Sequence, residues 1–105
     1  MRESIYRLDR FAVPAAARDE FLLNVRRTHE ILKDQPGFIW DAILEQDAGT
    51  GEFNFVTIAE WENETHIRAA KAVVAEVHRK AAFNPQEMFA RLGITADIAN
   101  YKYAE

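Results

Sequence analysis

The sequence predicts an α+β fold of the ferredoxin-like type, in which four strands form one antiparallel sheet and helices cover one of its faces. Two observations carry this prediction. Hydrophobic periods of two and of 3.6 residues follow one another in the order strand, helix, strand, strand, helix, strand, with an extra short helix before the last strand. The chain has 105 residues and contains no repeat or linker, which suits a single domain spanning residues 1–105.

The first half of the chain is predicted to form a strand, a helix and a second strand. Residues 4–13 read as a strand, with apolar side chains at Ile5, Tyr6, Leu8, Phe11 and Val13 and charges at Arg7, Asp9 and Arg10. Pro14 is predicted at the first position of the helix, where its missing N–H is not needed. The helix continues to about Lys33 and ends at the Pro36-Gly37 turn. Its inner stripe consists of Phe21, Leu22, Val25, His29 and Leu32.

The second half begins with a predicted hairpin. Strands at residues 38–46 and 52–61 are joined by a glycine-containing loop. Asn63 suits the cap of a helix that reaches about Ala82. The buried stripe expected for this helix consists of Ile67, Ala70, Val74, Val77 and Ala81.

A short helix and a last strand complete the predicted fold. Asn84 is placed to cap the short helix, Pro85 fits its first position, and Glu87 can complete a capping box. Gly93 suits the left-handed residue that ends it. Residues 94–103 then form the last strand.

The hairpin strands are apolar on both faces, which predicts a partner chain. One set of alternating side chains comprises Phe38, Trp40, Ala42, Leu44, Phe53, Phe55, Ala59 and Trp61, and the other includes Ile39, Ile43, Val56 and Ile58. Only one set can face the chain's own helices, and the other would form an exposed apolar patch. A two-fold homodimer that pairs two sheet faces removes this patch. The assembly expected in solution is therefore a homodimer that pairs through the sheet face.

Composition and motifs exclude several classes of function. The formal net charge of −4 argues against a nucleic-acid surface. The absence of cysteine excludes disulfides, thiol nucleophiles and cysteine-based metal sites. No close histidine pair, glycine-rich phosphate loop or nucleophile motif is present, so no cofactor and no metal are expected. No apolar run approaches a membrane span, and the first ten residues lack the apolar core of a signal peptide, which predicts a cytoplasmic protein without membrane contact.

Two stretches of the sequence carry a resemblance to a known family. Gln35-Pro36-Gly37-Phe38 opens the second strand, and Phe55-Val56-Thr57-Ile58-Ala59-Glu60-Trp61 ends the third strand directly before a helix. With the order and lengths of the elements, they resemble the antibiotic biosynthesis monooxygenase superfamily of dimeric α+β barrels over nearly the whole chain. The resemblance implies a ligand pocket in each subunit between sheet and helices. Some members resemble cofactor-independent oxygenases of phenol- or quinol-type substrates, whereas others degrade haem or rearrange small signalling metabolites.

The haem-degrading branch is only partly matched. Its members carry an Asn in the first strand, a Trp within the second helix and a His near the end of that helix. Here the first position corresponds to Asp9, Ala69 and Ala70 lie near the second, and His78 lies near the third. Because two of the three signature residues are missing, the sequence favours another activity.

Ionisable residues supply the candidate catalytic groups. His66, in the opening turn of the second helix, and His78, later in that helix, are candidate proton acceptors, because histidine titrates near neutral pH. His29 lies on the inner stripe of the first helix. Each of the three can instead be a boundary histidine satisfied by a local hydrogen bond. Asp9, two residues from Arg7 on one strand face, can act as a base, hold a substrate hydroxyl or form a simple salt bridge.

Large side chains supply the candidate substrate contacts. Trp61 and Trp40 can stack against a flat aromatic substrate, or simply pack in the core or the dimer. In the resembling family an Asn and a Trp of the third strand have this role, and Asn54 and Trp61 are the nearest matches. Phe83 and Met88 can cover a pocket, and Tyr101 can present its hydroxyl to it.

The function expected from the resemblance and these residues is that of a cofactor-independent monooxygenase acting on a small aromatic molecule. Two alternatives remain open. One is a non-catalytic homodimer that binds a small apolar metabolite, and the other is a haem-degrading monooxygenase.

Overall fold

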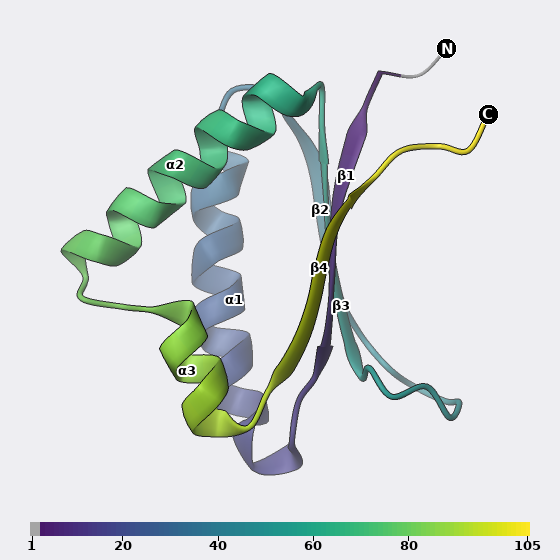
Figure 1. The fold of residues 1–105 in the computed structure, drawn as a ribbon, viewed down its shortest axis with the longest axis vertical. Coiled ribbons are helices and arrows are strands. Elements are labelled where there is room, and N and C mark those ends of the chain that lie inside the picture. Colours follow the sequence, from purple (N-terminus) through teal and green to yellow (C-terminus); the bar gives the residue numbers. More distant parts are fainter. Residues whose placement is uncertain (1–2) are drawn as a thin grey trace.

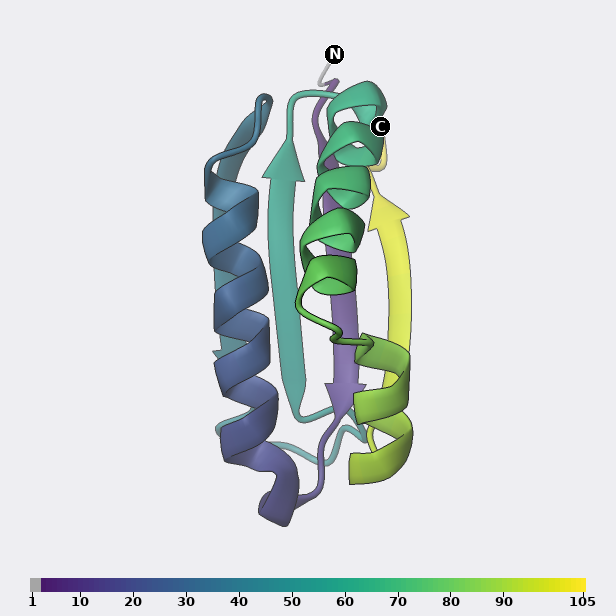
Figure 2. The same cartoon turned by 90° about the vertical axis from the view of Figure 1, so that its left-hand side faces the viewer.

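The computed structural model describes residues 3–105, which form a four-stranded antiparallel sheet with helices on one face only (Figure 1, Figure 2). The strands are β1 (Ile5–Ala12), β2 (Phe38–Glu45), β3 (Phe55–Trp61) and β4 (Thr95–Tyr101). The helices are α1 (Arg18–Lys33), α2 (Glu64–Lys80) and α3 (Pro85–Leu92), with a 3-10 turn, η1 (Ala15–Ala17), before α1. The strand order β2-β3-β1-β4 confirms the predicted ferredoxin-like arrangement. Within the described residues, no helix combines the length and apolar character needed to cross a membrane.

The connection from β1 to α1 differs from the prediction. Pro14 has extended backbone angles, φ −58° and ψ 146°, and its carbonyl accepts a hydrogen bond from the Ala17 N–H at 2.9 Å. It therefore precedes η1, and the α-helix begins only at Arg18. Proline fixes φ but leaves ψ free, so its presence alone could not locate the first helical residue. The predicted inner side chains Phe21 and Leu22 are buried against the sheet.

A β-bulge near the start of β2 decides which of its side chains face the helices. Phe38 pairs with Trp61, but the next paired residue is Trp40, opposite Glu60, so Ile39 is an extra residue. An extra residue reverses the alternation of side chains along a strand. Phe38 therefore lies on the helix-covered face, whereas Trp40 lies on the uncovered face. The prediction that these two aromatic residues share a face is wrong for this reason.

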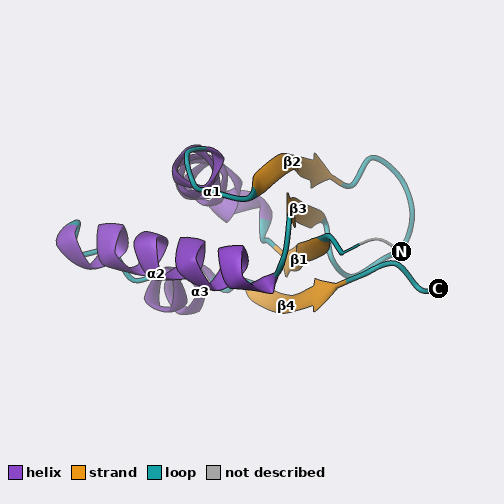
Figure 3. Ribbon diagram, turned by 90° about the horizontal axis from the view of Figure 1, so that it is seen from above, coloured by secondary structure: helices purple, strands orange, loops and turns teal. Residues whose placement is uncertain are grey.

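The uncovered face of the sheet, called here the outer face, is largely apolar. Figure 3 shows that all helices lie on the other side of the sheet. On the outer face Trp40 is 43% exposed and Leu44 is 51% exposed. The strand registers place the following apolar residues on it: Tyr6, Leu8, Trp40, Ala42, Leu44, Val56, Ile58, Ala99 and Tyr101. The chain's own helices leave this surface uncovered.

β3 begins three residues later than predicted, and Asn54, just before it, bonds to its neighbours through both backbone and side chain. Its N–H donates to the Phe11 carbonyl at 2.9 Å and its carbonyl accepts from the Gln46 N–H at 2.8 Å. Its Oδ1 accepts a hydrogen bond from the Val13 N–H at 2.7 Å, and its Nδ2 donates one to the Val13 carbonyl at 2.9 Å. The strand ladder between β1 and β3 therefore stops at the Phe11–Phe55 pair. Residues 52–54 belong to the loop.

α2 departs from the sheet along its length (Figure 1). Its first half buries Ile67 and Ala70, as predicted. Farther along, Val77 is 40% exposed, and Ala81, which follows the last helical residue, is exposed as well. The prediction that the buried stripe continues to these two residues is wrong, because helical periodicity describes one helix and not its distance from the sheet. α3 lies against the sheet in the region that α2 has left (Figure 1).

The apolar core is divided into two clusters. The Phe21 cluster consists of Phe11, Val13, Ala17, Phe21, Leu22, Phe55 and Ile94. The Trp61 cluster consists of Ala59, Trp61, Ile67 and Ala70. Along β3, the buried hydroxyl residue Thr57 stands between them. The middle of the helix-covered face is therefore the part of the sheet that apolar packing does not fill.

Gly37 offers a test of the packing between the start of β2 and the start of α2. Its φ is +84°, and a Cβ at this position would lie 2.2 Å from the ring of His66. Gly37→Ala is expected to lower the free energy of unfolding by about 2 kcal/mol or more, through backbone strain and steric clash. The control is Gly51→Ala, where the nearest atom is 3.4 Å away, with an expected change within about 0.5 kcal/mol. Equal stability of the two variants in urea unfolding would contradict this packing.

Candidate functional site

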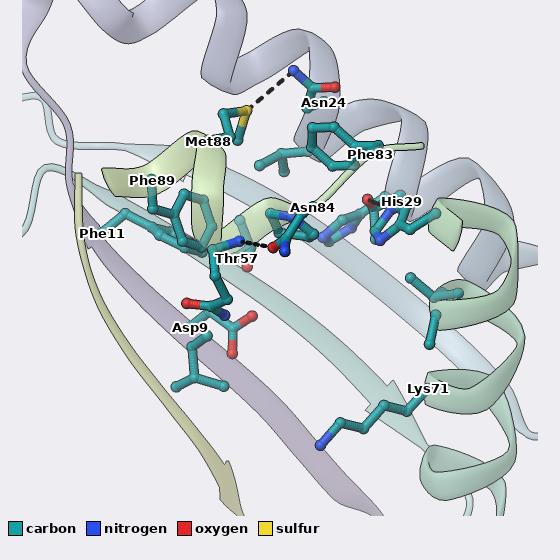
Figure 4. A pocket seen from close by; sticks show the side chains of 18 of the residues that line it. Asp9, Phe11, Asn24, His29, Thr57, Lys71, Phe83, Asn84, Met88 and Phe89 are labelled. Carbon is teal, nitrogen blue, oxygen red and sulfur yellow. Dashed lines mark hydrogen bonds between the residues drawn. The ribbon is translucent and has the colours of Figure 1, made fainter. Parts of the chain in front are cut away.

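A cavity of about 550 Å³ lies between the helices and the middle of the sheet (Figure 4). A cavity of this volume accommodates a small organic molecule. Its apolar lining consists of Phe11, Val25, Val74, Ala75, Phe83, Pro85, Met88, Phe89 and Ile98. Its polar lining consists of Arg7, Asp9, Asn24, Thr28, His29, Thr57, Lys71, His78, Arg79, Asn84 and Gln86. The sheet supplies the floor, α1 one wall, and α2 with α3 the opposite wall.

The floor of the cavity is polar because β1 and β3 bring hydrophilic side chains to the helix-covered face. Arg7 and Asp9 are two residues apart on β1 and therefore point to the same side. Arg7 Nε donates a hydrogen bond to Asp9 Oδ1 at 3.0 Å. Thr57 of β3 pairs with Asp9 across the two strands. Burial raises the pKa of the Asp9 carboxyl, and the neighbouring Arg7 opposes this rise only in part.

A histidine and an aspartate connect α1 to β2 at the edge of this floor. His29 Nδ1 lies 2.7 Å from Asp41 Oδ2. His29 is only 6% exposed and lines the cavity, and Asp41 is half-buried beneath it. Asp41 faces the helices because the bulge in β2 sets the register in which it pairs with Ala59. The pair is the closest contact between a histidine and a carboxylate in residues 3–105.

His78 stands on the opposite wall, near the end of α2. Its Nε2 lies 3.4 Å from the Thr28 hydroxyl, and its ring meets that of Phe83 edge to face, with centroids 5.0 Å apart. Ala82, with φ +53°, turns the chain directly before Phe83. Burial lowers the pKa of His78, which favours its neutral form at pH 7.

α3 closes the end of the cavity with its apolar face. Asn84 caps this helix, accepting hydrogen bonds from the N–H groups of Gln86 and Glu87, as the sequence predicted for a cap at this position. Met88 is buried, and its sulfur lies 3.3 Å from the Asn24 amide nitrogen of α1 (Figure 4). This contact holds α3 beside α1. The thioether adds a polarizable, adaptable surface to the wall.

The charges around the cavity are mostly positive, although the chain as a whole carries a net charge of −4. Arg7, Lys71 and Arg79 line it, and Asp9 is the single carboxylate residue among the described lining residues. Arg79 is paired with Glu76, whereas Lys71 extends from α2 toward the sheet (Figure 4). A cavity with more basic than acidic side chains in its lining favours the binding of an anion over that of a cation.

The structure places some of the predicted site residues at the cavity. Asp9, His78, Phe83 and Met88 all line it, although they come from β1, α2, the α2–α3 connection and α3. Their separation in the sequence gave no indication that they meet. Sequence reasoning missed Asp41, although an aspartate within the apolar run of β2 is itself a signal of a buried polar contact.

The other predicted site residues lie outside the lining of this cavity. Trp40 and Tyr101 are on the outer face. Trp61 is buried in the Trp61 cluster, where its ring packs against Phe38. Asn54 holds the end of β1 through its bonds to Val13, as described above. His66 packs beside Gly37, with its Nε2 3.6 Å from a Glu62 carboxylate oxygen.

A two-layer α+β fold with a ligand-sized cavity between sheet and helices defines the general class of this protein. Residues 4–82 match the family model described as antibiotic biosynthesis monooxygenase, and the chain belongs to this family. The membership supports a monooxygenase-type function. No curated protein sequence matches the chain.

Solved structures with a similar fold are described as different kinds of protein. SnoaB from Streptomyces nogalater, a cofactor-independent oxygenase, is 21% identical over 98% of this chain and 95% of that chain, with a TM-score of 0.68. The haem-degrader MhuD from Mycobacterium tuberculosis, solved with two haems in its active site, is 19% identical over 96% of each chain, with a TM-score of 0.68. A conserved protein from Methanosarcina mazei Go1 is 17% identical over 97% and 94%, with a TM-score of 0.67. At these identities the likeness shows the shared fold.

The buried Asp9 carboxyl gives a pH-dependent prediction. Burial raises its pKa in the fold above the ordinary value of 3.8, so its charged form destabilises the folded state at neutral pH. Asp9→Asn, which keeps the size of the side chain without the charge, is expected to raise the melting temperature at pH 7 by a few degrees. The gain should vanish as the pH falls below 3.8, where Asp9 is protonated in both states.

The matched control for this experiment is Asp47→Asn in the exposed loop after β2. Its melting temperature should follow that of the wild type at every pH. A lower melting temperature of Asp9→Asn at pH 7 would show that the Arg7 pair outweighs the cost of burial.

Proposed function

We propose that this protein is a cofactor-independent monooxygenase that oxidises a small phenol- or quinol-type molecule in the cavity. The observation that supports this most directly is the union of aromatic walls and a polar, ionisable floor in one cavity of about 550 Å³. Apolar walls exclude water from a flat ring, and ionisable groups can accept its phenolic proton. SnoaB, a cofactor-independent oxygenase, has a similar fold.

The proposed reaction needs only the substrate and molecular oxygen. Loss of the phenolic proton leaves an electron-rich anion, which supplies the electrons for reaction with O₂. A ring carbon bonds to one oxygen atom, and the other leaves as water with two hydrogens of the substrate, so that a phenol becomes a quinone. The contribution of the protein is to orient the ring, exclude water and stabilise the anion.

Cavity residues suit these roles. Phe83 and Met88 are proposed to contact the ring, and Asp9 to accept a hydrogen bond from a second substrate hydroxyl. Arg7 and Lys71 would stabilise the anion. His78, neutral at pH 7, is one candidate proton acceptor, from the wall opposite His29.

Oxygen consumption tests the proposal. Wild-type protein with a panel of phenols and quinols, and no added cofactor, is expected to consume O₂ and yield a product that by mass has gained one oxygen atom and lost two hydrogen atoms. Ala75→Trp, which fills the α2 wall, is expected to lower the rate roughly tenfold or more, by displacing the substrate. Ala72→Trp, one turn earlier and outside the cavity lining, is the matched control and should retain the rate. No uptake with any member of a broad panel would contradict the proposal.

Two other activities would leave different signatures in the same samples. A non-catalytic binding protein would retain a phenol or an apolar metabolite in equilibrium dialysis without consuming oxygen. Haem degradation is favoured by His78 at the cavity and by the fold shared with MhuD. A haem titration followed at the Soret band separates it from the leading proposal.

We also propose that two copies pair through their outer faces. The largely apolar surface described above, with Trp40 and Leu44 about half exposed, supports this, because a monomer would leave it in water. A two-fold dimer covers the same face in both copies.

Sedimentation tests the dimer. Wild-type protein is expected to sediment at micromolar concentration with twice the 12.1 kDa mass of the chain. Ile58→Glu, on the outer face, should shift it to monomer, because pairing would bury an unpaired charge. Leu23→Glu makes the same chemical change at an exposed position of α1 and should leave the dimer intact. A stable wild-type monomer would contradict the pairing.

A further inference from the structure

We propose that His29 and Asp41 are the proton-accepting pair of the cavity: His29 Nε2 takes the phenolic proton of the substrate, and Asp41 orients the ring. The inference deepens the proposed function and takes its substrate class, a phenol, from it. His29 would be the catalytic residue because it contacts the substrate. Asp41, which acts through His29, would be a positioning residue.

The geometry determines which nitrogen is available. Asp41 Oδ2 lies 2.7 Å from His29 Nδ1, so an ionised carboxylate accepts the Nδ1–H and fixes the tautomer with Nε2 unprotonated. Among residues 3–105, Nε2 has no hydrogen-bond partner. No fully enclosed side-chain nitrogen or oxygen of these residues lacks a partner, so Nε2 must have some exposed surface. Because His29 lines the cavity and its Nδ1 is taken by Asp41, Nε2 is the ring nitrogen left for a ligand there.

The other ionisable groups of the cavity are less suited to accept the proton. His78 places its Nε2 near the Thr28 hydroxyl, and within residues 3–105 no carboxylate pairs with it to stabilise its charged form. Asp9 already accepts a hydrogen bond from Arg7 at Oδ1, and the proposed function gives it another role, as the acceptor for a second substrate hydroxyl. His29, by contrast, lines the cavity, has the Asp41 carboxylate at its Nδ1, and keeps Nε2 for the substrate. The charged groups that share this space with it are Arg7, Asp9, Lys71 and Arg79, besides Asp41 itself.

The proposed step is a proton transfer without oxidation or reduction. The O–H bond of the phenol breaks and an N–H bond forms at His29 Nε2, while the electron pair stays on the phenolate oxygen. The imidazolium that forms is stabilised by Asp41, and Arg7 and Lys71 offer charge to the phenolate. Reaction of this anion with oxygen follows as proposed above.

A chromogenic phenol tests the pair without any oxidation. The probe is 4-nitrophenol, whose anion is yellow, at a pH about one unit below its own pKa, where most of the free probe is neutral. Wild-type protein is expected to bind it and raise its ratio of anion to neutral form roughly tenfold. His29→Gln should bind the probe in its neutral form. Asp41→Asn, which keeps the size of the side chain, should lose most of the same rise.

Matched variants make the outcomes decisive. His66→Gln removes a histidine outside the cavity and should behave as wild type. Melting temperatures and circular dichroism establish that each variant is folded. If His29→Gln does not fold, the result with Asp41→Asn alone decides the test. The proposal is overturned if wild-type protein leaves the probe neutral or unbound, if both variants keep the yellow signal, or if His78→Gln abolishes it in their place.

The failure of this inference is distinguishable from failure of the proposed function. Ionisation of the probe that depends on His29, with no oxygen uptake from any phenol or quinol, supports the pair and contradicts the monooxygenase. Oxygen uptake that persists at the wild-type rate in His29→Gln supports the monooxygenase and overturns the pair.

Discussion

A polar strip across the middle of the sheet interrupts the apolar core, and the rest of the structure depends on this interruption. On β1 the inward side chains pass from Phe11 through Asp9 and Arg7 to Ile5, and on β3 Thr57 separates the two apolar clusters. Charged groups in a dry core need partners. Helices that packed closely over this strip would deprive it of the remaining water, so the strip and the cavity above it belong together.

α2 makes the cavity by its direction. Its first turns pack in the Trp61 cluster, and its later turns leave the sheet, so that α3 rather than α2 reaches the Phe21 cluster (Figure 1). His78, Phe83 and Met88 line the space between them. α2 can both pack against the sheet and leave space for the cavity, because only its first half is needed to bury apolar area.

The cavity has a cost in stability, which is typical of a functional site. Burial raises the pKa of Asp9, so the fold retains at neutral pH a carboxylate that water would hold more favourably. Residues that lower the stability of the fold are expected at positions where function requires them.

The candidate site could be predicted from the sequence only in part. His29 was recognisable as an inward residue of α1, because helical spacing defines one face of a helix. Its partner Asp41 was not, since the bulge at Ile39 sets the register that brings this carboxylate under α1. Trp40 was wrongly grouped with Phe38 on one face for the same reason. A bulge depends on pairing between strands, and strict alternation in the sequence does not reveal it.

The sequence by itself determined the order of the elements, the caps of α2 and α3 and the ferredoxin-like topology, because these follow from local periodicity and from residues that begin or end helices. Only the tertiary structure decided where α2 leaves the sheet, which face of β2 is inward, and which ionisable side chains share one cavity. These depend on contacts between residues far apart in the chain, and such contacts arise from packing that no local pattern encodes.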